Sequence, residues 1–150
     1  MKLIRSLLDY GKPWALPDVY LFTGNPIRKN NGAIVMGRGA AKQVRDTYPR
    51  VQHQFGELIK DQPNALVLFA PVYGANSTQY IGWFKVKDHW QEPAKLSLVK
   101  ASAARLDQIA AARPEMRFHI NFPAVGNGKL VEQDIMPLIN LMADNVIVYR

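Results

Sequence analysis

Short apolar segments alternate with segments of helical periodicity along this chain, and this alternation is what most restricts its fold. The strand-like segments are, in chain order, Val19–Phe22, Ala65–Ala70, Gln79–Lys87, Phe118–Phe122 and Asn145–Tyr149. Apolar residues at helical spacing lie between them, in the segments 40–48, 51–59, 93–110 and 135–142. Elements in this order form a mostly parallel or mixed sheet with helices packed on both faces. We therefore predict a three-layer α/β/α protein, organised as one domain over residues 1–150.

The segment Ala65–Ala70 is the clearest buried strand in the sequence. It contains no polar residue, and such a continuous apolar run is typical of a strand that is covered on both faces. We predict that it is a central strand of the sheet. An early loop is expected between Pro13 and Pro17.

The charge and the residue types present exclude several classes of protein. The net charge of +7 favours an anionic partner, but the longest basic run is Arg28–Lys29, so a phosphate-bearing small ligand fits as well as nucleic acid. A generally basic surface without function is the alternative. The chain has no cysteine, which excludes disulfides and thiolate catalysis, and we expect no metal and no cofactor. The apolar runs are too short for a signal peptide or a membrane span, so we expect a cytoplasmic protein with no membrane partner.

Two glycine-bearing segments follow predicted strands and precede predicted helices. The first is 31–41, which contains Gly37-Arg38-Gly39, and the second is 123–130, which contains Gly126-Asn127-Gly128. Glycine allows the backbone to approach a ligand closely, and a helix N-terminus offers free N–H groups to phosphate. The alternatives are an ordinary strand-to-helix turn in the first segment and a tight loop with left-handed residues at Asn127 and Gly128 in the second.

A candidate reactive lysine lies near the end of the strand 79–87. Alternation places Lys85 and Lys87 on the face opposite Phe84 and Val86. A lysine becomes a nucleophile when burial or neighbouring cations lower its pKa, and Lys85 is a candidate neighbour for Lys87. A solvated surface lysine is the alternative.

Taken together, these segments resemble the macrodomain superfamily, and within it the branch of terminal ADP-ribose glycohydrolases and DNA ADP-ribosyl glycohydrolase antitoxins. The residues that carry the resemblance are Asn25, Met36-Gly37-Arg38-Gly39-Ala40-Ala41, Val86-Lys87-Asp88-His89-Trp90 and Ala124-Val125-Gly126-Asn127-Gly128-Lys129-Leu130. The similarity extends from about Val19 to the C-terminus. It implies a macrodomain-like mixed sheet that binds ADP-ribose or an ADP-ribosylated macromolecule.

The resemblance also implies roles for individual positions. Asn25 matches the asparagine that contacts the distal ribose, and Lys87 matches the lysine that takes part in deglycosylation. The remaining implied ligand-binding positions belong to the two glycine segments: Gly32, Met36, Gly37, Arg38, Gly39, Ala40, Val125, Gly126, Asn127 and Gly128. Asp9 and Asp18 are the candidates for the acidic residue that reads the adenine in the family.

The sequence departs from the family at two positions that bear on catalysis. Some members have a catalytic aspartate where Gly128 stands, and the residue before Lys87 is Val86 rather than threonine. The leading prediction is an enzyme that hydrolyses an ADP-ribosyl linkage or ADP-ribose 1″-phosphate. A reader that binds ADP-ribose without chemistry, and a basic nucleic-acid-binding module, are the alternatives.

Overall fold

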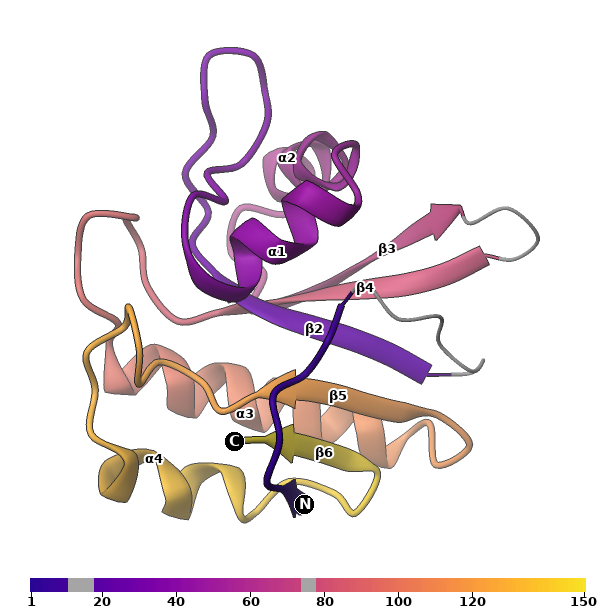
Figure 1. Ribbon diagram of the computed structural model, residues 1–150, viewed down its shortest axis with the longest axis vertical. Helices are drawn as coiled ribbons and strands as arrows, with labels where there is room; N and C mark the ends of the chain where they lie inside the picture. The colour runs from indigo at the N-terminus through magenta and orange to yellow at the C-terminus, as the bar shows by residue number, and fades with distance from the viewer. Residues whose placement is uncertain (11–17, 74–77) are drawn as a thin grey trace.

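The computed structural model describes residues 1–10, 18–73 and 78–150, and these form a six-stranded sheet with helices on both faces (Figure 1). The strands are β1 (Lys2–Ile4), β2 (Asp18–Gly24), β3 (Val67–Tyr73), β4 (Thr78–Lys85), β5 (Arg117–Asn121) and β6 (Val146–Tyr149). The helices are α1 (Gly39–Thr47), α2 (Val51–Asp61), α3 (Leu96–Ala111) and α4 (Glu132–Ile139). The predicted α/β/α architecture is confirmed.

The sheet is parallel except at one edge. Its order is β1-β6-β5-β2-β4-β3, and only β3 is antiparallel to its neighbour. Gly24 pairs with Lys85, and Asn121 pairs with Tyr149, each at the last residue of its strand. The carboxyl ends of β2, β4, β5 and β6 therefore lie along one edge of the sheet, which is where α/β proteins of this kind bind ligands.

Two apolar layers enclose the sheet. One joins α3 and α4 to side chains of β2, β4, β5 and β6, among them the fully buried Leu21 and Phe84. The other joins α1 and α2 to the opposite face of β2, β3 and β4, where Phe22 and Trp83 are buried. Both faces of β2 and β4 are therefore covered, and the ends of these strands lie between the two packed layers.

The prediction that Ala65–Ala70 forms a central strand is wrong, because β3 is an edge strand. Side chains of β3 alternate between the two apolar layers. The strand is therefore apolar on both faces, although no described strand pairs with one of its two backbone edges. Its Pro71, which has no N–H to donate to a ladder, is typical of an edge strand. The Pro71 carbonyl accepts a hydrogen bond from Gln54 Nε2 at 2.7 Å.

Other differences concern element boundaries. The sequence did not indicate β1, and α3 begins at Leu96 rather than near Pro93. The loop expected between Pro13 and Pro17 lies outside the described residues. Among the described helices, none combines the length and apolar character needed to cross a membrane.

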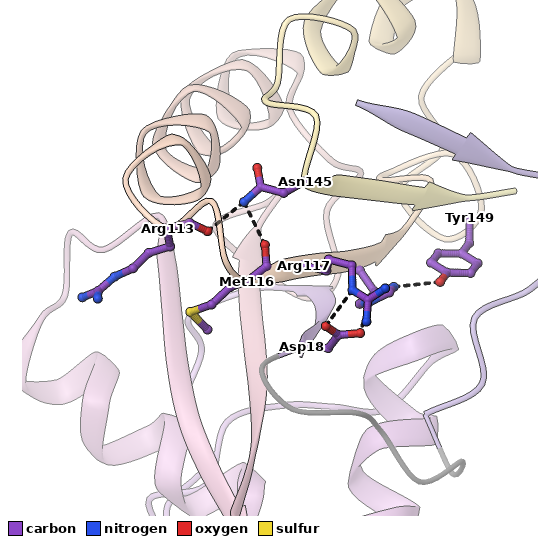
Figure 2. Close-up of polar contacts among 7 residues, drawn as sticks. Asp18, Arg113, Met116, Arg117, Asn145 and Tyr149 are labelled. Atoms are coloured by element: carbon purple, nitrogen blue, oxygen red, sulfur yellow. Dashed lines mark hydrogen bonds and ion pairs between the residues drawn. The ribbon is translucent and has the colours of Figure 1, made fainter.

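The turn after α3 is stabilised by one side chain. Asn145 Nδ2 lies 2.9 Å from the carbonyl oxygen of Arg113 and 2.8 Å from that of Met116 (Figure 2). It also lies 2.9 Å from the carbonyl oxygen of Ala110. The Ala110 carbonyl belongs to the last turn of α3 and the other two carbonyls lie in the turn that follows it, where backbone acceptors lack the i→i+4 partner of a helix interior. Asn145 therefore connects the end of α3 to the start of β5.

Candidate functional site

A cleft of about 1180 Å³ opens at the carboxyl edge of the sheet. Its lining comes from the residues that follow β2, the N-terminus of α1, the segment between β4 and α3, the loop after β5 and the end of β6. These segments are far apart in the sequence and meet because their strands end at one edge.

Asn25, the residue after β2, is held in a local turn at the cleft. The residue is 6% exposed, and its Oδ1 accepts the backbone N–H of Ile27 at 3.0 Å. The chain then leaves the sheet in a hairpin-like excursion, in which Arg28 forms an isolated bridge with Ile34. This excursion returns the chain to the start of α1, so Asn25 and the N-terminus of α1 lie on the same cleft.

The N-terminus of α1 faces the cleft without a side-chain cap. Arg38 is the N-cap residue and forms no capping hydrogen bond, so the first N–H groups of the helix have neither a helical nor a capping partner. Gly39 has φ +57°, a conformation in which glycine is strongly favoured. No atom lies within 4 Å of the position that a Cβ would occupy at Gly37. The local chemistry favours an anion at this position.

The loop after β5 reaches the N-terminus of α1. Asn127 Nδ2 lies 3.0 Å from the position of a Cβ at Gly39, so the two glycine segments are in contact. The space at a Gly126 Cβ is open, as it is at Gly37. Together, the two glycine segments form one backbone-lined wall of the cleft.

The left-handed residues of this loop are not the ones suggested by the sequence. Positive φ angles occur at Ala124 (65°) and Lys129 (62°), which flank the Gly126-Asn127-Gly128 stretch, rather than at Asn127 and Gly128. A left-handed conformation costs a non-glycine residue about 1 to 2 kcal/mol. Hydrogen bonds from Leu130 N to Ala124 O (2.9 Å) and from Ala94 N to Gly128 O (2.9 Å) hold the loop in this shape.

Lys87 also lines the cleft, two residues beyond the end of β4. Partial burial lowers the pKa of its amine, and the charges of Arg38 and Lys129 lower the pKa further. Lys85, which the sequence suggested as the neighbouring cation, is instead paired with Asp88 at 3.2 Å. The cations beside Lys87 therefore come from the two glycine segments.

The cleft is strongly basic. Among the described residues that line it, the basic ones are Arg28, Lys29, Arg38, Lys87, Lys129 and Arg150. Glu92 is the one acidic residue in that described lining. This imbalance suits a ligand that carries more than one negative charge.

Most of the predicted site residues meet at this cleft. Those in its lining are Asn25, Gly37, Arg38, Gly39, Ala40, Lys87, Val125, Gly126, Asn127 and Gly128. Two lie elsewhere: Met36 is 1% exposed within the apolar layer of α1 and α2, and the Gly32 carbonyl lies against Gly56 of α2. The ends of β5 and β6 add Phe122, Tyr149 and Arg150 to the lining. These three residues were not predicted from the sequence. They could have been found from the rule that parallel strands end at the same edge of a sheet.

Asp18, a candidate for the adenine-reading acid, lies at the opposite end of β2, roughly 20 Å of extended strand from Gly24. Its carboxylate contacts Arg117 Nε and His119 Nε2, each at 2.9 Å, and His119 Nδ1 lies 2.7 Å from the Tyr149 hydroxyl (Figure 2). Burial lowers the pKa of His119 although Asp18 opposes this effect. Asp18 thus connects the starts of β2 and β5. The other candidate, Asp9, is exposed and is not among the described residues that line the cleft.

Comparisons with known proteins place the fold. No family model and no curated protein matches the chain. Among solved structures, the macrodomain of Mycobacterium tuberculosis DarG has a TM-score of 0.74 at 22% identity, covering 98% of this chain and 96% of its own. The macrodomain of Thermus aquaticus DarG has a TM-score of 0.72 at 20% identity, with coverages of 99% and 95%. The chain therefore has the macrodomain fold, as the resemblance implied.

A third solved structure is Thermosipho africanus DarTG in complex with ADP-ribose. Its TM-score is 0.73 at 16% identity, and the match covers 87% of this chain and 37% of that chain. The similarity at this level of identity concerns the fold.

Proposed function

We propose that this chain binds ADP-ribose in the basic cleft, with the pyrophosphate against the backbone of the two glycine segments. The observation that carries the proposal is their contact at Gly39 and Asn127, beside an uncapped helix N-terminus. Open space at Gly37 and Gly126 leaves the backbone N–H groups accessible to phosphate oxygens. The complex of Thermosipho africanus DarTG with ADP-ribose supports this choice of ligand, because the 37% of that chain covered by the match has the same fold.

We further propose that the chain hydrolyses an ADP-ribosyl linkage or ADP-ribose 1″-phosphate, with Lys87 as the catalytic residue. A neutral Lys87 amine attacks the anomeric carbon, and the bond to the acceptor breaks with its electron pair leaving on the acceptor. Water then releases ADP-ribose and regenerates the amine. In an alternative route, the ammonium form stabilises the negative charge that develops on the leaving group. The lowered pKa of Lys87 favours the first route, because it increases the neutral fraction near neutral pH.

A reader that binds without catalysis is the second candidate. It is favoured by the scarcity of acid–base groups, because Glu92 is the one carboxylate in the described part of the lining and glycine occupies position 128. The six basic residues of that lining are also compatible with an ADP-ribosylated nucleic acid as the ligand.

Calorimetry with ADP-ribose tests binding, and a release assay tests catalysis. The substrates, run in parallel, are ADP-ribosylated DNA, ADP-ribosylated protein and ADP-ribose 1″-phosphate. We expect Lys87→Ala to abolish release while leaving the affinity for free ADP-ribose nearly unchanged. Lys100→Ala is the matched control, because Lys100 is an exposed lysine of α3 outside the described lining.

The outcomes separate the candidates. Binding without release from any substrate by the unmodified protein refutes the enzyme and leaves the reader. Absence of ADP-ribose binding refutes both, and binding of unmodified DNA alone would then identify a nucleic-acid module.

A further inference from the structure

Asp88, the residue after Lys87, is bound by a lysine on each side. Its Oδ1 lies 3.2 Å from Lys85 Nζ, and its Oδ2 lies 2.7 Å from Lys95 Nζ. Each carboxylate oxygen therefore has its own cationic partner. The Lys85 side chain is only 12% exposed, whereas those of Asp88 and Lys95 are about half exposed.

The two lysines stand at the end of β4 and at the start of α3. Lys85 is the last residue of β4, and its carbonyl accepts a hydrogen bond from the buried Ser102 hydroxyl at 2.6 Å. Lys95 is the N-cap residue of α3, and its N–H donates to the Val86 carbonyl at 2.9 Å. The Val86 N–H in turn donates to Gly24 of β2 at 3.1 Å. The segment between Lys85 and Lys95 is thus fixed at both ends, and Asp88 connects those ends.

This arrangement matters because Lys87 lies among charges of both signs. Arg38 and Lys129 act on it from the two glycine segments, and Lys85 and Lys95 belong to its own segment. The other charged residues of the described cleft lining are Arg28, Lys29, Glu92 and Arg150. Asp88 is the acidic residue adjacent to Lys87 in the sequence, and a free carboxylate there would pair with the ammonium group and favour its charged form.

We propose that Lys85 and Lys95 form a carboxylate clamp that holds Asp88 away from Lys87 and so keeps the Lys87 amine unpaired in the cleft. Lys85, Asp88 and Lys95 are positioning residues in this arrangement. The consequence for catalysis rests on the proposed function of Lys87, whereas the clamp itself is measurable without any activity.

A double-mutant cycle tests the clamp. The pKa of Lys87 is measured by NMR titration of protein with ¹³C-labelled lysine, with the signal assigned from Lys87→Arg. The Asp88→Asn substitution is made in two backgrounds, the unmodified protein and Lys85→Met/Lys95→Met. With the clamp present, neutralising Asp88 should change the pKa of Lys87 little. Without the clamp, Asp88 is free to pair with Lys87, so its neutralisation should lower that pKa by about one unit or more.

The same variants predict a change in the rate of ADP-ribose release. The Lys85→Met/Lys95→Met protein should show a pH–rate profile shifted to alkaline pH, with roughly tenfold slower release at neutral pH, and adding Asp88→Asn should restore the rate. A purely structural role for the clamp would not move the pH profile. Lys95→Met alone, at a half-exposed position, provides a milder background if the double variant does not fold.

If Asp88→Asn changes the pKa of Lys87 by the same amount in the two backgrounds, the proposed clamp is refuted. Because this titration needs no substrate, it decides the proposal even if the unmodified protein releases no ADP-ribose. Failure of the proposed function and failure of the clamp are therefore separate results.

Discussion

Gly126→Val should weaken ADP-ribose binding strongly without unfolding the protein. The position has open space, because no atom lies within 4 Å of a Cβ built on Gly126, and its φ lies outside the left-handed region. The Cβ of a valine there clashes with no atom outside its chain neighbours, and substitutions at such exposed positions usually change the free energy of unfolding by less than about 0.5 kcal/mol. Its methyl groups would instead occupy the space proposed for the pyrophosphate.

The size of the effect follows from the contacts that are lost. Hydrogen bonds to a charged group contribute about 1.5 to 3 kcal/mol each. Blocking two backbone N–H contacts to the pyrophosphate should therefore weaken binding by roughly 100-fold or more. Gly37→Val, in the other glycine segment, should have a similar effect for the same reason.

Calorimetry with ADP-ribose measures the affinity, and thermal unfolding measures the stability. Gly128→Val is the contrasting variant, because a Cβ at Gly128 would lie 2.5 Å from the Ala124 carbonyl oxygen. It should lower the midpoint of thermal unfolding, unlike Gly126→Val. Unchanged ADP-ribose affinity in both Gly126→Val and Gly37→Val would refute the proposed position of the pyrophosphate.

Two further predictions concern stability. Gly56→Ala should lower the urea midpoint of unfolding, because a Cβ on this helical residue would lie 1.8 Å from the Gly32 carbonyl oxygen. Overpacking costs roughly 1 to 3 kcal/mol, which should exceed the gain of about 1 kcal/mol in helix propensity. An unchanged midpoint would contradict this packing. The lowered pKa of His119 means that below about pH 6.5 the unfolded chain binds a proton that the folded protein does not. The free energy of unfolding should therefore fall as the pH drops from there towards the folded-state pKa, by at most about 1.4 kcal/mol per pH unit. The free energy of unfolding, measured from denaturation curves between pH 7.5 and 5, should depend less steeply on pH in His119→Gln than in the unmodified protein. Equal pH dependence in the two proteins would exclude His119 as the cause.

Much of the architecture could be predicted because it depends on local side-chain patterns. The predicted strand Val19–Phe22 lies inside β2, and the predicted strand Phe118–Phe122 is shifted by one residue from β5. Both could be found because a buried strand needs apolar side chains whatever surrounds it. The glycine segments could also be placed, because each follows a predicted strand, and strands of such a sheet end at the ligand-binding edge. The order of strands in the sheet depends on backbone pairing, which leaves little trace in side chains. That is why Ala65–Ala70 looked central, and Pro71 was the one local sign of an edge.

The sequence by itself therefore determined the order of strands and helices after β1, the basic charge and the segments able to approach a phosphate. Only the tertiary structure decided which of these segments meet. It brought Arg38 and Lys129 beside Lys87 and paired Lys85 with Asp88 instead, and it placed Met36 in the core rather than in the cleft. The physical reason is that burial and charge at a site depend on distances through space, between residues that are far apart in the chain.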